Sequence, residues 1–150
     1  MKKMIALSIL VFRISVNCFS QNNQIDEELI KSLIQKFSIM WTHQNGAQIA
    51  EQVISENFLY IVNQRSYNKK QYLSFLISIL RDNKPMSHTH EIYNIQVKDN
   101  IAYEYGKIIM VLKNGTIQNI KTLNIFIKEN EEWKLISNLP VEMMKAVLQD

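Results

Sequence analysis

The sequence predicts an α+β domain in which N-terminal helices pack on one face of a curved antiparallel β-meander. Two observations support this fold class. Four β-rich segments separated by short polar turns fill the last third of the chain. The segments before them are mainly helical in periodicity. Helices followed by consecutive strands are typical of an α+β domain with the helices on one side of the sheet. The four predicted strands are 86–97, 101–113, 116–128 and 132–140.

The first residues have the pattern of a secretory signal peptide. Two lysines give a basic start, an apolar run covers residues 4–12, and small or polar residues lead to a predicted cleavage point after Ser20. The apolar run is too short to span a bilayer, which needs about 20 residues. We therefore expect an exported protein, periplasmic or extracellular, with a leader (1–20), a polar tether (21–24) and a folded domain (25–150).

Cys18 is the single cysteine and lies inside the predicted leader. A lipoprotein anchor at Cys18 is the second alternative, because Ser15-Val16-Asn17 matches the usual small-residue motif poorly. Cleavage after Ser20 would leave a mature chain without cysteine. Such a chain has no disulfides, no thiolate metal ligands and no cysteine nucleophile.

The net charge changes its meaning once the leader is set aside. The chain has 17 Lys and Arg against 14 Asp and Glu. Lys2, Lys3 and Arg13 belong to the leader, which leaves 14 basic and 14 acidic side chains in the mature domain. Nucleic-acid binding needs a basic stripe on the folded domain, and the sequence predicts none.

The segment before the meander predicts three helices and one strand. Apolar residues recur at three- and four-residue steps from Ile25 to Trp41 and predict the first helix. A shorter helix over 47–54 and a strand over 57–63 follow. Residues 64–67 are predicted to be a loop, and Asn68 is placed to cap a third helix that stops before Pro85.

Two turns set the predicted register of the meander. Asp99-Asn100 and Asn114-Gly115 are each interpreted as two-residue hairpin turns, since both pairs tolerate positive φ. Side chains alternate between the two faces of a strand, so the turns decide which residues share a face. The predicted interior face consists of Tyr93, Ile95, Val97, Ala102, Glu104, Leu123, Ile125, Ile127 and Ile136.

The opposite face carries aromatic and amide side chains, a mixture that suits a protein–protein contact. We therefore expect a homodimer through this outer sheet face. The residues assigned to it are His88, His90, Asn94, Gln96, Tyr103, Tyr105, Thr122, Asn124, Phe126 and Leu135.

Three motifs in order resemble a known superfamily. The first runs from Trp41 through a polar-Gly turn and a short helix to Glu56-Asn57-Phe58-Leu59-Tyr60. The second is the hairpin 97–106, and the third joins Ile125-Phe126-Ile127-Lys128 to Trp133-Lys134-Leu135-Ile136. Together they are similar to the NTF2-like, SnoaL-like superfamily and, within it, to small secreted proteins of the DUF4440 type. The resemblance implies a cone-shaped α+β barrel, usually dimeric, with a pocket between the sheet and the helices.

Glu104 is the candidate catalytic residue. A carboxyl between Ile95 and Ile125 in the interior would be costly to ionise without a partner, and its pKa should rise towards the range of a general acid or base. The alternative is a carboxylate at the solvated rim or one paired with a lysine. Aromatic bodies with polar tips suit a small-molecule pocket. The predicted pocket residues are Trp41, Tyr60, Tyr93, Glu104, Leu123 and Ile125.

The histidines do not predict a metal site. His88 and His90 share one face of a strand, but a zinc site needs at least three protein ligands and His43 is far away in the sequence. The expectation is two exposed histidines, with no metal and no cofactor. The resemblance also fails at positions that steroid-isomerase-like members use, because Val62 and Leu123 stand where acids are expected.

Three functions remain open from the sequence. The first is a secreted dimeric module that binds a small apolar ligand without catalysis. The second is a SnoaL-like isomerase, cyclase or hydratase, with Glu104 as acid or base and Tyr60 or Tyr93 as hydrogen-bond donor. The third is a structural interaction domain whose cavity is filled by its own side chains.

Overall fold

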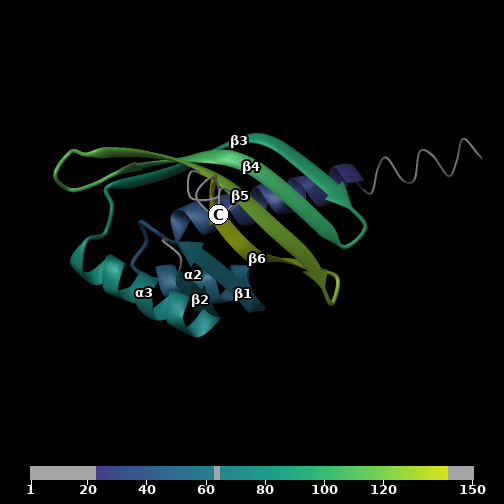
Figure 1. Ribbon diagram of the computed structural model, residues 1–150, viewed down its shortest axis with the longest axis horizontal. Helices are drawn as coiled ribbons and strands as arrows, with labels where there is room; N and C mark the ends of the chain where they lie inside the picture. Colours follow the sequence, from purple (N-terminus) through teal and green to yellow (C-terminus); the bar gives the residue numbers. More distant parts are fainter. Residues whose placement is uncertain (1–22, 63–64, 142–150) are drawn as a thin grey trace, which may run out of the picture.

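The computed structural model describes residues 23–62 and 65–141, where helices cover one face of a curved six-stranded sheet (Figure 1). The predicted leader and Cys18 lie outside the described residues, whereas residues 23 and 24 of the predicted tether are helical. The elements are a first helix (23–39), α2 (Gly46–Val53), β1 (Ile54–Val62), β2 (Arg65–Asn68), α3 (Lys69–Asp82), β3 (Ser87–Lys98), β4 (Ile101–Val111), β5 (Ile117–Glu129) and β6 (Glu132–Pro140).

The predicted α+β fold class is confirmed, and the sheet is larger than the predicted meander. Strands β3 to β6 are antiparallel neighbours in sequence order, as expected. Strand β1 then joins β6 in parallel, which makes the sheet mixed. The segment predicted as a loop before Asn68 forms strand β2, because it folds back on β1 and pairs Tyr67 with Tyr60 at the sheet edge.

The helices bury the faces that their periodicity predicts. The first helix buries Ile30, Ile34 and Phe37, at steps of four and three residues. Ile25 and Leu29, counted on the same face in the sequence, are 59% and 47% exposed. The core continues across the helix–sheet interface with Met40, Ala50, Val53, Ile54, Phe58, Tyr72, Leu76, Ala102, Phe126, Trp133 and Leu135.

Asn68 caps α3 as predicted. Its side chain accepts a hydrogen bond from the backbone N–H of Gln71 at 3.0 Å, and the Gln71 side chain accepts from the backbone N–H of Asn68 at 3.0 Å. This reciprocal capping box satisfies two backbone donors at the helix start. The helix is therefore fixed where it leaves the β1–β2 hairpin.

Asp26 ties the first helix to the sheet. Its Oδ1 accepts a hydrogen bond from Trp133 Nε1 at 2.8 Å and forms an ion pair with Lys128 Nζ at 3.1 Å. The carboxylate thus satisfies an indole N–H that burial would otherwise leave unpaired. Trp133 is 4% exposed, so its indole reports on the core.

The first predicted turn is confirmed and the second is wrong. Asp99-Asn100 is a two-residue connection that pairs Val97 with Ala102 and Ile95 with Glu104. The β4–β5 loop has three residues, 113–115, because Leu112 N–H bonds Thr116 O at 2.9 Å and Gly115 takes a φ of +81°. A three-residue hairpin loop ends on such a left-handed residue.

This extra residue exchanges the two faces of β5. Glu104 lies opposite Asn124, not Ile125, and Ala102 lies opposite Phe126. A slip of one residue turns every side chain of a strand to the other face. Thr122, Asn124 and Phe126 are therefore buried at 1% exposure each, which removes them from the predicted dimer face. Leu123, Ile125 and Ile127 are half-buried and lie on the outer face.

A bulge in β3 likewise turns His88 and His90 to the face opposite to the predicted one. The pairing with β4 shifts between Ile92 and Asn94, so Tyr93 is the extra residue. The alternation reverses there: His88 and His90 point to the interior, as do Ile95 and Val97 beyond the bulge. Tyr93 is 49% exposed and packs edge-on against Tyr105, with ring centroids 5.5 Å apart. Its predicted interior position is wrong.

Within residues 23–62 and 65–141, no helix combines the length and the apolar character needed to cross a membrane.

Candidate functional site

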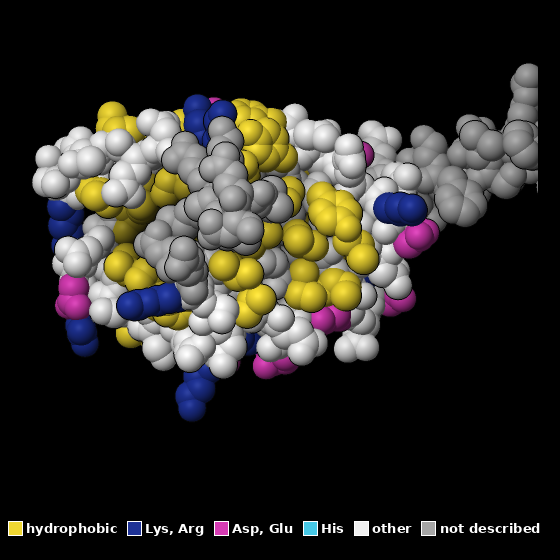
Figure 2. Space-filling view, in the orientation of Figure 1, with side chains coloured by type: hydrophobic (Ala, Val, Ile, Leu, Met, Phe, Trp, Pro, Cys, Tyr) yellow, Lys and Arg dark blue, Asp and Glu magenta, His cyan; other side chains and the backbone are white. Residues whose placement is uncertain are grey.

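A pocket of about 360 Å³ opens between the far end of the β4–β5 hairpin, the first helix and α3. Figure 2 shows a hollow with hydrophobic walls between that hairpin and α3. The volume is within the range of small-molecule sites. The lining residues are Phe37, Trp41, Tyr60, Phe75, Ile79, Asn83, Pro85, His88, Ile108, Met110, Leu112, Gln118, Ile120, Thr122, Asn138 and Pro140.

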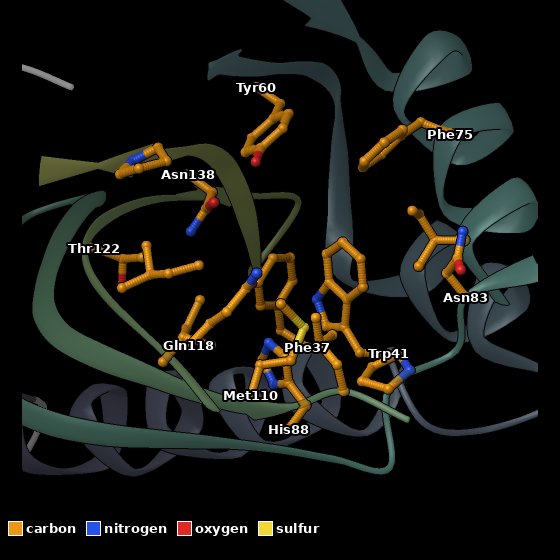
Figure 3. Close-up of a pocket in the computed structure, with 16 residues that line it drawn as sticks. Phe37, Trp41, Tyr60, Phe75, Asn83, His88, Met110, Gln118, Thr122 and Asn138 are labelled. Carbon is orange, nitrogen blue, oxygen red and sulfur yellow. The ribbon is translucent and has the colours of Figure 1, made fainter. Parts of the chain in front are cut away.

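A few polar side chains converge on this largely apolar space. Tyr60, Asn138 and Gln118 point towards the middle of the pocket (Figure 3). Burial, and to a smaller extent the neighbouring Tyr67, raises the pKa of the Tyr60 hydroxyl. Tyr60 therefore stays protonated around neutral pH and can donate a hydrogen bond.

Trp41 forms one wall and carries an unused donor. Its indole stacks on the His88 ring, with centroids 5.7 Å apart and planes 11° apart, and meets Tyr72 edge-on at 6.4 Å. The Nε1 atom is buried and has no hydrogen-bond partner among the described residues. In Figure 3 the indole forms part of the pocket wall. A buried N–H without a partner is costly, so it is a place where a bound molecule would be stabilised.

His88 is held neutral. Burial first, and then the nearby His90, lowers the pKa of His88 from 6.5 to about 4. Its Nδ1 is buried without a partner among the described residues. At neutral pH the imidazole is therefore an uncharged wall of the pocket, and it is too weak a base to remove protons efficiently.

We expect the free energy of unfolding to depend less on pH between 4 and 6.5 in the His88→Phe variant than in the wild type. Unfolded His88 takes up a proton near its usual pKa of 6.5, but folded His88 does so only near 4. The contribution of His88 to the free energy of unfolding is therefore fully present above pH 6.5. As the pH falls towards 4, about 3 kcal/mol of this contribution is lost. Phenylalanine keeps the stack on Trp41 without titrating. Urea unfolding at several pH values measures the difference between variant and wild type.

His43→Gln is the control, since it removes an exposed histidine that does not line the pocket. Identical slopes for wild type and His88→Phe between pH 4 and 6.5 would contradict the prediction.

Behind the pocket wall, Glu104 anchors a buried chain of polar side chains. His90 Nε2 lies 3.1 Å from Glu104 Oε1, and Asn124 Nδ2 donates to Glu104 Oε2 at 2.6 Å. Asn138 Nδ2 then donates to Asn124 Oδ1 at 2.6 Å. Glu104 is 0% exposed, Asn124 1% and Asn138 5%, so water is excluded along the chain. The hydrogen bonds replace hydration for each buried group.

Gly106 makes room for this chain. A Cβ on Gly106 would collide with the Glu104 carboxylate, and it would lie 2.5 Å from the backbone oxygen of Glu91 and 2.7 Å from His90 Nε2. Only a residue without a side chain lets the His90–Glu104 pair close over the strand. The glycine serves packing at this position.

The structure brings together part of the predicted site. Trp41 and Tyr60 line the pocket, whereas Glu104 lies behind the wall and reaches it through Asn124 and Asn138. The other three predicted residues, Tyr93, Leu123 and Ile125, lie on the outer face.

The pocket also contains residues that the sequence interpretation missed. His88, Thr122 and Asn138 line it, and the sequence had placed the first two on the outer face. Gly115 is the one relevant feature of the sequence, because a glycine also suits the last position of a three-residue loop, which would have moved Thr122 inside. No comparable signal marks the bulge at Tyr93.

In the part of the chain that the structure describes, no three His, Cys, Asp or Glu side chains come together as metal ligands. The His90 side chain is 2% exposed and His88 is partly buried, so neither is exposed as predicted, because the bulge turns this end of β3 inwards. His90 is engaged with Glu104.

Comparison with known proteins supports the fold. No protein-family model matches the chain, and no curated protein matches it significantly. Among solved structures, it is similar to an NTF-2 like protein of unknown function from Shewanella oneidensis MR-1, with 16% identity, a TM-score of 0.64, and coverage of 75% of this chain and 96% of the other.

Two further structures agree. A conserved protein from Planctomyces limnophilus DSM 3776 has 14% identity and a TM-score of 0.66, over 78% of this chain and 98% of the other. A protein of unknown function with a cystatin-like fold from Nostoc punctiforme has 13% identity and a TM-score of 0.64, over 76% and 88%. Likenesses at this identity show the fold alone, which is the NTF2-like cone.

Proposed function

We propose that the domain binds a small, mostly apolar molecule that carries a hydrogen-bond acceptor. The observation that carries this proposal is the buried Trp41 Nε1, which has no partner among the described residues and belongs to a side chain that lines a pocket of about 360 Å³. The apolar walls favour burial of a hydrocarbon skeleton, and the indole N–H orients one polar atom. An open pocket of this size also argues against the alternative of a domain filled by its own side chains.

Nuclear magnetic resonance of the two indole N–H groups tests the proposal. We suggest 4-tert-butylcyclohexanone as the probe, since it is a compact apolar molecule with one acceptor oxygen. The Trp41 signal is expected to shift on titration. The Trp133 signal is a built-in control, because its N–H already donates to Asp26 at 2.8 Å. A shift of neither signal, together with no binding by calorimetry, would contradict the proposal.

We expect the Trp41→Phe variant to bind the ketone about three- to tenfold more weakly. Phenylalanine keeps an aromatic wall and the stack on His88 but removes the N–H donor, and one hydrogen bond contributes about 0.5–1.5 kcal/mol. Isothermal titration calorimetry measures the change. Phe75→Leu, at another wall of the same pocket, is the matched control and leaves the donor in place. Unchanged affinity in Trp41→Phe would show that Nε1 does not contact the ketone.

Catalysis by Glu104 is the second candidate, and it has less support. Both carboxylate oxygens of Glu104 are engaged by His90 and Asn124, and the side chain is 0% exposed. A general acid or base must come within hydrogen-bond reach of the reacting group. What favours this candidate is the continuous chain from Glu104 through Asn124 to Asn138 at the pocket wall.

Dimerisation through the outer face of the sheet is part of the same proposal, as is export by the predicted leader. Ile101 and Tyr103 are 41% and 44% exposed, and Tyr93 beside them is 49% exposed. Leu123 and Ile125 add apolar surface on the same face, in register with Tyr105 and Tyr103. Figure 2 shows hydrophobic side chains gathered over β4 and β5. Such a patch, on a sheet face that none of the described helices covers, is typical of an interaction surface.

We expect Tyr103→Lys to weaken the dimer at least tenfold, because a buried charge without a partner opposes association. Sedimentation equilibrium of the mature chain measures the dissociation constant. Ile77→Lys is the control, since Ile77 is 53% exposed on α3, away from the sheet face. A wild-type chain that is monomeric at micromolar concentration would contradict the dimer.

A further inference from the structure

The chain from Glu104 to the pocket has a fixed direction. A carboxylate has acceptor oxygens and no proton to give. Asn124 must therefore turn its Nδ2 towards Glu104 Oε2, as the 2.6 Å contact has it. Asn124 Oδ1 then faces Asn138, whose Nδ2 donates a hydrogen bond to it at 2.6 Å. Glu104 thus fixes the orientation of the Asn124 amide, and Asn124 fixes that of the Asn138 amide.

The consequence appears at the pocket wall. With Nδ2 committed to Asn124, Asn138 has its Oδ1 left as an acceptor, and no hydrogen bond within the described residues occupies that oxygen. Asn138 lines the pocket, and Figure 3 shows its side chain turned towards the space that Tyr60 also faces. A reversed Asn138 amide would place its Oδ1 against Asn124 Oδ1, which sets two acceptors against each other with water excluded from the chain.

We infer that this pocket selects alcohols, because Asn138 presents a fixed acceptor to a hydroxyl donor of the bound molecule. The inference rests on the proposed function and adds the chemical class of the ligand. Asn138 is then a specificity-determining residue, and Glu104 is a positioning residue that acts through Asn124. The apolar walls accept the skeleton of an alcohol and of the matching ketone equally well.

The cost of desolvation distinguishes the alcohol from the ketone and the methyl ether. A hydroxyl gives up a donated hydrogen bond to water when it enters the pocket, and only an acceptor in the pocket restores it. A ketone or methyl ether brings no donor, so it leaves Asn138 Oδ1 unpaired. All three molecules can accept a hydrogen bond from Trp41, so this contact does not separate them.

The test compares trans-4-tert-butylcyclohexanol with its methyl ether and with 4-tert-butylcyclohexanone by calorimetry on the full mature chain. We expect the alcohol to bind about three- to tenfold more tightly than the other two. In Asn138→Leu this preference disappears, whereas in Gln118→Leu, which removes another amide of the pocket wall, it persists. The wild-type comparison stands even where a variant fails to fold.

Ketone and ether that bind as tightly as the alcohol would overturn the inference and leave the proposed function intact. Loss of the preference in Gln118→Leu but not in Asn138→Leu would also overturn it. If none of the three molecules binds, the proposed function fails as well, and the inference fails with it.

Discussion

The Glu104→Ala variant is expected to lose about 3–5 kcal/mol of unfolding free energy, which is a large fraction of the stability of a domain of this size. The substitution removes the acceptor that His90 Nε2 and Asn124 Nδ2 share at 3.1 Å and 2.6 Å. Both groups remain buried, so water cannot replace the carboxylate. The cavity left by the side chain adds to the cost. Urea denaturation at pH 7, followed by circular dichroism, measures the loss.

Two further variants isolate the cause. Glu104→Gln fills the same volume and can still bond both neighbours, so we expect it to cost less than half as much as alanine. Glu91→Ala removes a carboxylate that is 46% exposed and pairs with Lys107, and the change should stay within about 0.5 kcal/mol. If Glu104→Ala were as stable as the wild type, the hydrogen bonds of Glu104 would not stabilise the fold. Glu104 would then not fix the orientation of Asn124 and Asn138.

Glu104 was found from the sequence because one turn was interpreted correctly. Asp99-Asn100 fixes β3 against β4, so Ile95 and Glu104 face each other in the interior as predicted. The partners of Glu104 were not found, because the next loop contains one residue more than the predicted turn. Asn114-Gly115 fits a two-residue and a three-residue hairpin equally well, and only the hydrogen bond from Leu112 to Thr116 decides between them.

The histidines show a second limit of the sequence. Nothing in Glu91-Ile92-Tyr93-Asn94 signals a bulge, yet the extra residue Tyr93 turns the whole first half of β3 over. Two histidines then enter the interior, where His90 pairs with Glu104 and His88 stacks on Trp41. A bulge depends on how two strands twist against each other, and this is a property of the sheet.

The elements with a local cause were predicted well. The α3 helix starts where Asn68 can cap it, and the first helix buries Ile30 and Ile34 in the predicted period. Trp41, which follows the first helix, and Tyr60, which lies within β1, both line the pocket. Strand β2 was missed, since four residues with no apolar alternation gain their structure only by pairing with β1.

Gly106→Ala is expected to be as damaging as Glu104→Ala, at about 3 kcal/mol or more. An added Cβ would lie 2.5 Å from the backbone oxygen of Glu91, which cannot move without shifting β3, and 2.7 Å from His90 Nε2. Overpacking against backbone typically costs about 1–3 kcal/mol, and separation of the His90–Glu104 pair adds to it. Gly115→Ala is the control: its φ of +81° gives strain but its Cβ meets no atom within 4 Å, so we expect about 1 kcal/mol.

The double variant Gly106→Ala with Glu104→Ala decides whether the glycine serves the buried pair. Once the Glu104 carboxylate is removed, the new methyl group no longer collides with it. The His90–Glu104 hydrogen bond is already lost in Glu104→Ala, so Gly106→Ala cannot cost that energy a second time. The combined loss should therefore be smaller than the sum of the two single losses by about 1–2 kcal/mol, as expected for residues in contact. Strictly additive losses, measured by the same urea unfolding, would mean that Gly106 is needed only for the approach of Glu91 to β4. The absence of a side chain at residue 106 would then be a requirement of the sheet alone.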